Sequence, residues 1–202
     1  MFYFLYIYFM ADNRITLFDS YSFKEVSIEE FTPFFKENRP KVFANHTTIR
    51  VEDWMDEMEK QKVNVLSNLI KDRYQYRIFI YKDEEIIGWH VGRQIEGDSY
   101  NMGNTGIFEQ YQGLGIYTAL LPKLLEVFKE KGFQKVTSRH HASNNAVLVP
   151  KLKAGFRISS FEIDERFGVL VHLSYIFNER RLNAYKYRTG ELHPNDDIKK
   201  FL

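Results

Sequence analysis

The chain has 202 residues, 44% of them hydrophobic, which is enough to form one full core in a single domain. Its 28 basic and 27 acidic residues leave a net charge of +1, and this balance argues against nucleic acid or an anionic membrane as a partner bound through bulk charge. Cysteine is absent, which excludes disulfides, a thiolate nucleophile and a cysteine-type zinc site, and the cytoplasm is the simplest compartment.

The first ten residues are almost wholly apolar and aromatic. They are too short to span a bilayer, and they lack the basic region and small-residue cleavage site of a signal peptide, so we expect no membrane partner. Two interpretations stay open. Translation begins at Met10, which we favour, or residues 1–13 form an apolar extension that packs on the domain as an arm or an added strand.

Residues 14–98 predict three strands and two helices. We expect a short strand at 14–18 and a helix at 28–37 that ends at Arg39-Pro40, because proline has no N–H for the helical ladder. Strands at 76–81 and 85–91 are joined as a hairpin. The second helix is expected over 51–71, with one side buried through its apolar residues, which are Trp54, Met58, Val65, Leu66 and Leu69.

A glycine-rich segment, Gln110-Tyr111-Gln112-Gly113-Leu114-Gly115, separates a predicted strand at 99–108 from a predicted helix. The helix is indicated by apolar residues at helical spacing, which are Leu114, Tyr117, Leu120, Leu121, Leu124, Leu125 and Phe128. The first turn of a helix has N–H groups without intrahelical acceptors and a partial positive charge. The segment therefore predicts a site for a phosphate or diphosphate, although glycines also end strands for purely structural reasons.

Two nucleotide motifs are excluded at this segment. A P-loop needs Gly-Lys-Ser/Thr, but Ile116 and Tyr117 follow Gly115. A dinucleotide fingerprint needs a third glycine or alanine where Thr118 stands, and an acidic residue at the end of the next strand. The next strand, expected at 134–138, is followed by two histidines and no carboxylate.

The remainder of the chain continues the alternation of helix and strand. After Ser143-Asn144-Asn145 comes a short helix, and then Lys151-Leu152-Lys153-Ala154-Gly155-Phe156 leads into strands at 157–163 and 169–177. Residues 178–202 form a polar tail with some helix. Pro122 and Pro150 fall inside predicted helices, where each removes a hydrogen bond at a cost of about 3 kcal/mol, so we expect kinks there.

Two of these segments together resemble the motifs of the GNAT superfamily of acyl-CoA N-acyltransferases. Gln110 to Gly115 matches its Gln/Arg-x-x-Gly-x-Gly/Ala motif, and Asn144 followed by Gly155-Phe156 is similar to its later segment. The resemblance implies an α/β (mixed α+β) fold, with a sheet of about six to seven strands that is flanked by helices and splayed in the middle. It divides the chain into the extension at 1–13, the GNAT-like domain at 14–177 and the tail at 178–202.

The resemblance also implies that acetyl-CoA or coenzyme A is the cofactor and lies in the splay of the sheet. The expected contacts come from the strand before the glycines, the first helical turn and the later asparagine. These residues are Thr105, Ile107, Phe108, Gln110, Gln112, Gly113, Leu114, Gly115, Ile116, Tyr117 and Asn144.

The family's chemistry needs a base for the amine, a donor to the developing oxyanion and an acid for the leaving thiolate. The resemblance implies a backbone N–H within residues 105–107 as the oxyanion donor. Many relatives have a tyrosine acid where Lys151 stands, and a lysine there could hold a thiolate or contact a phosphate.

His140 is the first candidate for the base, because the unperturbed pKa of histidine is about 6.5. The alternative is a core histidine that is hydrogen-bonded to the backbone. We expect no metal site, since His140 and His141 are adjacent strand residues that point to opposite faces and no carboxylate accompanies them.

We therefore predict a cytoplasmic enzyme that moves an acetyl or acyl group from acetyl-CoA to the primary amine of a small molecule or peptide, with a homodimer as an open alternative. The runner-up is a non-catalytic acyl-CoA-binding or sensing module, favoured by the absent tyrosine and glutamate. The polar set Thr105, Ser138 and His140 favours the enzyme. The sequence does not indicate the acceptor, because the 51–71 helix and Asp164-Glu165-Arg166 carry both signs of charge.

Overall fold

The structure, a computed structural model, describes residues 14–44, 50–193 and 196. Eight strands in these residues form one sheet in the order β1-β2-β3-β4-β5-β6-β8-β7. The strands are β1 (Ile15–Phe18), β2 (Tyr21–Glu25), β3 (Gln75–Lys82), β4 (Glu85–Glu96), β5 (Ser99–Ile107), β6 (Lys135–His141), β7 (Arg157–Asp164) and β8 (Gly168–Ile176). Neighbouring strands are antiparallel except β5 and β6, which are parallel. The predicted mixed α/β sheet is confirmed.

The sheet has one strand more than we predicted. β2 pairs with β1 and β3, and its Phe23 is fully buried. The turn before it places Asp19 at φ 42°, a left-handed conformation that aspartate tolerates better than most residues. The sequence signal is weak because the strand has only five residues and its alternation of apolar and polar residues ends at Lys24.

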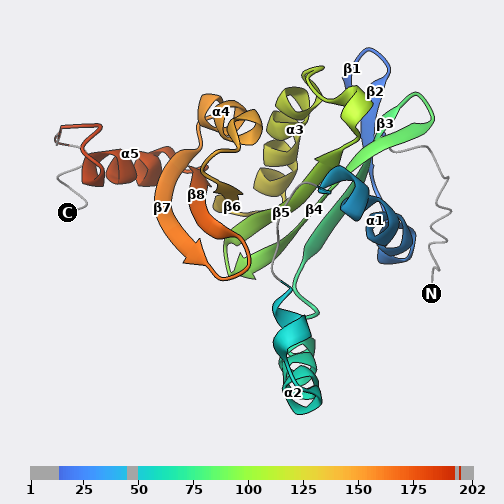
Figure 1. Cartoon of the computed structure of the whole chain (residues 1–202). Helices are drawn as coiled ribbons and strands as arrows, with labels where there is room; N and C mark the ends of the chain where they lie inside the picture. Colours follow the sequence, from blue (N-terminus) through green and yellow to red (C-terminus); the bar gives the residue numbers. More distant parts are fainter. Residues whose placement is uncertain (1–13, 45–49, 194–195, 197–202) are drawn as a thin grey trace, which may run out of the picture.

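Helices cover the two faces of the sheet separately (Figure 1). The helices are α1 (Ile28–Val42), α2 (Glu57–Asn68), α3 (Ile116–Glu130), α4 (Asn145–Lys153) and α5 (Glu179–Arg188), with 3₁₀ turns η1 (Val51–Trp54) and η2 (Glu109–Tyr111). On one face α3 and α4 pack in the larger core, where Leu120, Leu124 and Phe128 are fully buried. On the other face α1 packs through Phe31 against Phe79 and Trp89. None of the helices in the described residues is long and apolar enough to cross a membrane.

Helix α1 runs five residues past its predicted end, because its packing outweighs its prolines. A capping box between Ser27 and Glu30 fixes its start. Pro40 lies inside the helix, and the chain still closes its last turn through a 3.1 Å hydrogen bond from the Phe43 N–H to the Arg39 carbonyl. Phe43 and Val42 pack on the Trp89 cluster, and this burial compensates for the bond that Pro40 cannot make.

The single helix predicted over 51–71 is wrong in two respects. The segment divides into η1 and α2, with Met55 extended between them and Asp56 forming a new capping box with Glu59. The predicted buried side is also exposed, with Trp54 and Leu69 each 76% accessible, and α2 has no buried residue. Figure 1 shows α2 projecting away from the sheet.

Pro122 and Pro150 lie inside α3 and α4, and both helices continue past them. The predicted tail contains α5, which an Asn178 side chain caps and which the Tyr185 hydroxyl ties to the Ile158 carbonyl at 2.7 Å. The predicted apolar extension at 1–13, with its start at Met10, lies outside the described residues.

The sheet opens between β5 and β6. These strands pair only at Ser99–Lys135, Tyr100–Val136 and Asn101–Thr137 and separate beyond that point. On the other side β5 stays paired with β4 as far as Ile107, with a register shift that leaves Gly103 unmatched. The expected splay is therefore present, and it exposes the β5 edge from Met102 to Ile107.

Candidate active site in the splay of the sheet

A cavity of about 1000 Å³ occupies the opening between β5 and β6. Its walls also come from the loop before α3, the start of α3, α4 and the end of α1. Most of the predicted site residues line it, namely Thr105, Ile107, Gln112, Gly113, Gly115, Ile116, Tyr117, His140, Asn144 and Lys151. Five separate elements thus bring the two sequence motifs together around one space.

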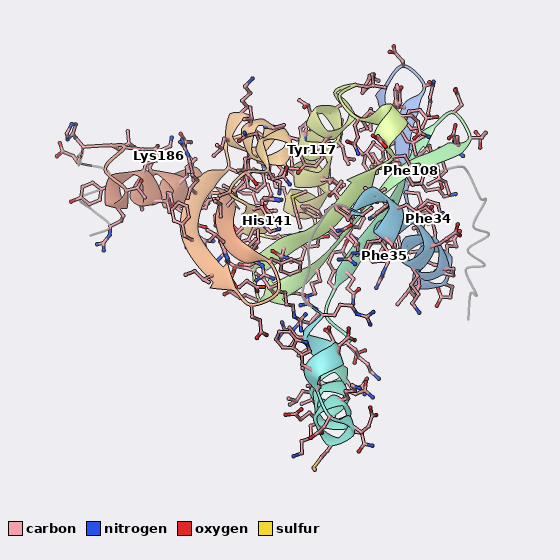
Figure 2. All side chains as sticks on the ribbon, in the orientation of Figure 1. Phe34, Phe35, Phe108, Tyr117, His141 and Lys186 are labelled. Carbon is pink, nitrogen blue, oxygen red and sulfur yellow. The ribbon has the colours of Figure 1, made fainter. Side chains whose placement is uncertain are left out.

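Three predicted cofactor residues do not line this cavity. The side chain of Leu114 is 51% exposed, and Gln110 is also exposed. Phe108 packs on the α1 side, with its ring centroid 6.2 Å from that of Phe34 and 6.1 Å from that of Trp89. Figure 2 shows Phe108 beside Phe34 in this aromatic cluster.

The glycine-rich segment forms an open cradle at the start of α3. Gly113 and Gly115 have φ of 77° and 80°, a left-handed region that strains any L side chain. Gly115 is the N-cap of α3, and no side chain caps the helix. Gln112 instead donates from Nε2 to the Ile107 carbonyl at 2.9 Å, which holds the loop to the end of β5. The first-turn N–H groups therefore lie at the cavity, and no side chain in the described part of the chain caps them.

The exposed edge of β5 carries backbone donors. The Ile107 carbonyl faces the opening, because it accepts a hydrogen bond from the Gln112 side chain. The N–H of the following residue, Phe108, points the other way and donates to the Ile87 carbonyl on the β4 side. Backbone groups of a strand alternate between its two edges. Thr105, two residues before Ile107, therefore also directs its N–H toward the opening, within the segment predicted to stabilise an oxyanion.

Lys151 is a buried lysine at the base of the opening. It is 1% exposed, and its Nζ lies 3.4 Å from the Met102 thioether and 4.8 Å from the centre of the Phe156 ring. No carboxylate pairs with it among the described residues. Burial without a counter-charge lowers the pKa of Lys151 to about 7, since the charged form is poorly solvated there.

His140 and Ser138 lie on one face of β6 and leave polar atoms unpartnered. The Ser138 Oγ and the His140 Nε2 are buried and have no hydrogen-bond partner in the described part of the chain. Burial, and next the positive charge of Lys151, lower the pKa of His140 to about 3, so this imidazole is neutral near pH 7. Unpartnered buried polar atoms are rare, and the His140 Nε2 fits a cavity that receives a polar ligand, whereas Ser138 does not line the cavity.

Thr105 has a structural reason to be polar that the sequence did not reveal. Its hydroxyl lies 2.8 Å from Nδ1 of His90, its cross-strand neighbour, and the His90 Nε2 lies 3.4 Å from the Tyr100 hydroxyl. Burial and the charge of Lys151 lower the pKa of His90 to about 3. His90 is thus a satisfied core histidine, and Thr105 is its partner.

Sequence reasoning missed several cavity residues, which include Arg39, Arg93, Met102, Arg139 and His141. Arg39 and Arg93 lie beyond the predicted ends of α1 and β4, so the predicted boundaries left them in loops. Figure 2 shows Tyr117 at the α3 wall and His141 at the β6 wall. Among the described residues, no group of three or more histidine, aspartate or glutamate side chains could hold a metal ion.

In a comparison with known protein families, residues 28–156 match the model of the "Acetyltransferase (GNAT) family". Comparison with curated protein sequences gives no match.

Three solved structures illustrate the similarity of fold. A ribosomal-protein-S5-alanine acetyltransferase from Vibrio fischeri has a TM-score of 0.60 and 15% identity over 82% of this chain and 97% of its own. A GNAT family acetyltransferase from Elizabethkingia anophelis with acetyl-CoA bound has a TM-score of 0.56 and 16% identity, over 79% of this chain and 99% of its own. A spermidine N-acetyltransferase from Vibrio cholerae has a TM-score of 0.56 and 14% identity, over 78% of this chain and 94% of its own.

The family match covers more than half of the chain, and the splayed sheet with its glycine cradle agrees with it. The chain therefore belongs to the GNAT family of acetyltransferases and is an acyltransferase that depends on acetyl-CoA.

Proposed function

We propose that this enzyme transfers the acetyl group of acetyl-CoA to a primary amine, with Lys151 as the acid for the leaving thiolate. The observation that carries the proposal is a lysine buried in the opening without a carboxylate partner. A protein that needed only packing here would place an apolar side chain, because a buried unpaired ammonium is destabilising.

The cradle would hold the diphosphate of coenzyme A. The N–H groups from Gly113 through Tyr117 and the dipole of α3 supply a positive site, and the glycines keep it free of side chains. The start of α3, which no side chain of the described residues caps, fits such an occupant. Acetyl-CoA supplies the activated acyl group, and the exposed N–H of Thr105 is the proposed donor to its carbonyl oxygen.

Lys151 would donate a proton from Nζ to the departing sulfur. With a pKa of about 7, the ammonium is half protonated near neutrality, which suits a general acid at that pH. The acid form is lost as pH rises through this pKa, whereas the fraction of neutral acceptor amine grows with pH. We therefore expect the dependence of kcat on pH to be bell-shaped.

His140 enters the proposal in a smaller role than the sequence predicted. A base with a pKa of about 3 is poorly matched to proton abstraction at neutral pH. As a neutral imidazole with an unpartnered Nε2, it is placed to accept a hydrogen bond from the amine, directly or through a water. We propose it as a catalytic residue that orients the nucleophile.

The acceptor is a small amine or a peptide amine in this proposal. The relatives named above act on a ribosomal-protein alanine and on spermidine, two acceptors of different size and charge. The division into a domain at 14–177 with an extension and a tail, and a cytoplasmic location, stay predictions.

An amine panel tests the proposed function. The full chain is mixed with acetyl-CoA and single amines, while free thiol is followed with a chromogenic disulfide and the acetylated amine by mass spectrometry. We expect equal amounts of thiol and acetylated product with at least one amine. Acetyl-CoA binding with no product from any primary amine, peptide amines included, would contradict the proposal and favour a binding module.

A further inference from the structure

The wall of the cavity carries positive charge and no carboxylate. Its charged lining residues are Arg39, Arg93, Arg139 and Lys151, and no aspartate or glutamate lines it within the described ranges. The chain as a whole is nearly neutral, with 28 basic and 27 acidic residues, so this bias is local. A concave surface of one sign concentrates ligands of the other sign.

Arg93 and Arg139 lie near the point where β5 and β6 separate, and Arg39 reaches the same cavity from the last turn of α1. Arg93 on β4 pairs across the sheet with Asn101, and Asn101 pairs with Thr137 at the point where β5 and β6 separate. Arg139 follows two residues later on the same face of β6. The six residue steps from Asn101 to Ile107 place Arg93 about 20 Å along β5 from the strand's end near the cradle, at roughly 3.3 Å per residue. Arg93 therefore lies too far away to serve the diphosphate.

The arginines differ in what holds them. Arg139 lies 3.1 Å from Glu162 and 3.8 Å from Asp164, and Glu162 also binds His172, so this arginine is fixed and partly neutralised from outside the cavity. Arg39, in the last turn of α1, and Arg93 have no carboxylate partner among the described residues. Their guanidinium charges remain available to a ligand.

We propose, resting on the function proposed above, that the acceptor is an amine that carries an oxyanion, bound by Arg39 and Arg93. A guanidinium presents two parallel N–H donors that match a carboxylate or phosphate. The apolar side chains of Val42, Phe43, Phe167 and Leu170 line the same cavity and suit the remainder of the acceptor. The positive wall also favours the neutral form of the bound amine, because a nearby like charge lowers the pKa of an ammonium group.

This inference excludes polyamines as the preferred acceptors. A polyamine would bring further positive charges against three arginines and Lys151, with no carboxylate on the cavity wall to offset them. An anionic group on the acceptor removes this repulsion and adds charge-assisted hydrogen bonds, which contribute about 1.5–3 kcal/mol each, or roughly 10- to 150-fold.

Matched acceptor pairs test the inference. The full chain is assayed with tyrosine against tyramine, phenylalanine against phenethylamine, and phosphoethanolamine against ethanolamine, with each rate corrected for the fraction of neutral amine. We expect the anionic member of at least one pair to have a kcat/KM at least tenfold higher, and the pair that shows it identifies the oxyanion as carboxylate or phosphate. Equal rates in every pair, or a preference for spermidine, would overturn the inference.

Two variants locate the effect. Arg93→Gln and Arg39→Gln should each remove most of the preference for the anionic acceptor by raising its KM. Arg188→Gln, at an exposed arginine in α5, should leave the preference unchanged. Binding of the N-acetylated products in the presence of coenzyme A, measured by calorimetry, separates this inference from the proposed function, because it needs no turnover. Anionic and neutral products that bind equally well to the wild-type protein would overturn the inference, whether or not the assay detects acetylation.

Discussion

The two ends of the cavity are built from different parts of the molecule. The cofactor end consists of backbone, with glycines of left-handed conformation and the uncapped start of α3. The catalytic and acceptor side consists of side chains, with a buried lysine, the neutral His140 and arginines from one helix and two strands. A common cofactor needs the same backbone shape in any such enzyme, whereas the acceptor needs side chains peculiar to one enzyme.

The largest effect is expected from Lys151 at the catalytic end. Lys151→Met should lower kcat/KM by about two to four orders of magnitude, the usual effect of losing a positioned general acid. The same change should keep or raise the melting temperature, because it replaces a buried unpaired charge by an apolar side chain of similar length.

Steady-state kinetics and thermal denaturation of one sample check both outcomes. Lys153→Met, an exposed change on the same helix, is the control and should alter neither quantity. If Lys151→Met retained full activity, Lys151 would have no catalytic role, and the proposed division between a backbone cofactor site and a side-chain catalytic site would be wrong.

Acid should destabilise the fold through its two desolvated histidines, His90 and His140. His90 and His140 have folded-state pKa values of about 3, below the usual 6.5, so the unfolded chain binds more protons between these values. Stability is then fully present above about pH 6.5 and falls as pH decreases toward 3. At pH 5 each histidine should lower the free energy of unfolding by about 2 kcal/mol, or roughly 4–8 °C in melting temperature.

Melting curves from pH 5 to 7.5 measure this effect. His140→Asn should reduce the pH dependence by about half, and His193→Asn, at an exposed position, should leave it unchanged. An unaltered pH dependence in His140→Asn would show that this imidazole is solvated rather than buried.

The smallest effect is expected at the cofactor end. Gly113→Val forces a branched residue into φ 77°, which should lower the free energy of unfolding by about 1–2 kcal/mol and weaken acetyl-CoA binding about tenfold. The control is Gly190→Val, which puts a branched residue at φ 80° and, like Gly113→Val, into open space. Gly190 follows α5 and does not line the cavity. The control should lose similar stability and keep its affinity, as measured by calorimetry. Equal affinities in the two variants would show that the cradle does not hold the cofactor.

The sequence was informative where local pattern decides structure. The apolar spacing of α3 correctly predicted a helix with a buried face that begins after the glycines, because this pattern is a property of neighbouring residues. The segment at 51–71 has a similar stripe, yet Trp54 and Leu69 are exposed. Periodicity shows which side chains share a helix face, but only the tertiary fold decides whether anything covers that face.

The acceptor end was harder to predict for a related reason. Arg39, Arg93 and Arg139 are about fifty residues apart in sequence, and they line one cavity because the sheet opens beyond Asn101. Arg39 and Arg93 also lie beyond the predicted ends of α1 and β4. The acidic and basic residues at 164–166 had suggested mixed charge there, but Arg166 pairs with Glu52 at 3.2 Å and does not line the cavity.

A structure of the protein with coenzyme A tests the central claim most directly, through the distance between Lys151 Nζ and the coenzyme sulfur. The account predicts that these atoms lie within hydrogen-bond distance, with the diphosphate on the N–H groups from Gly113 to Tyr117. A sulfur placed away from Lys151, or a diphosphate bound outside the α3 cradle, would contradict it.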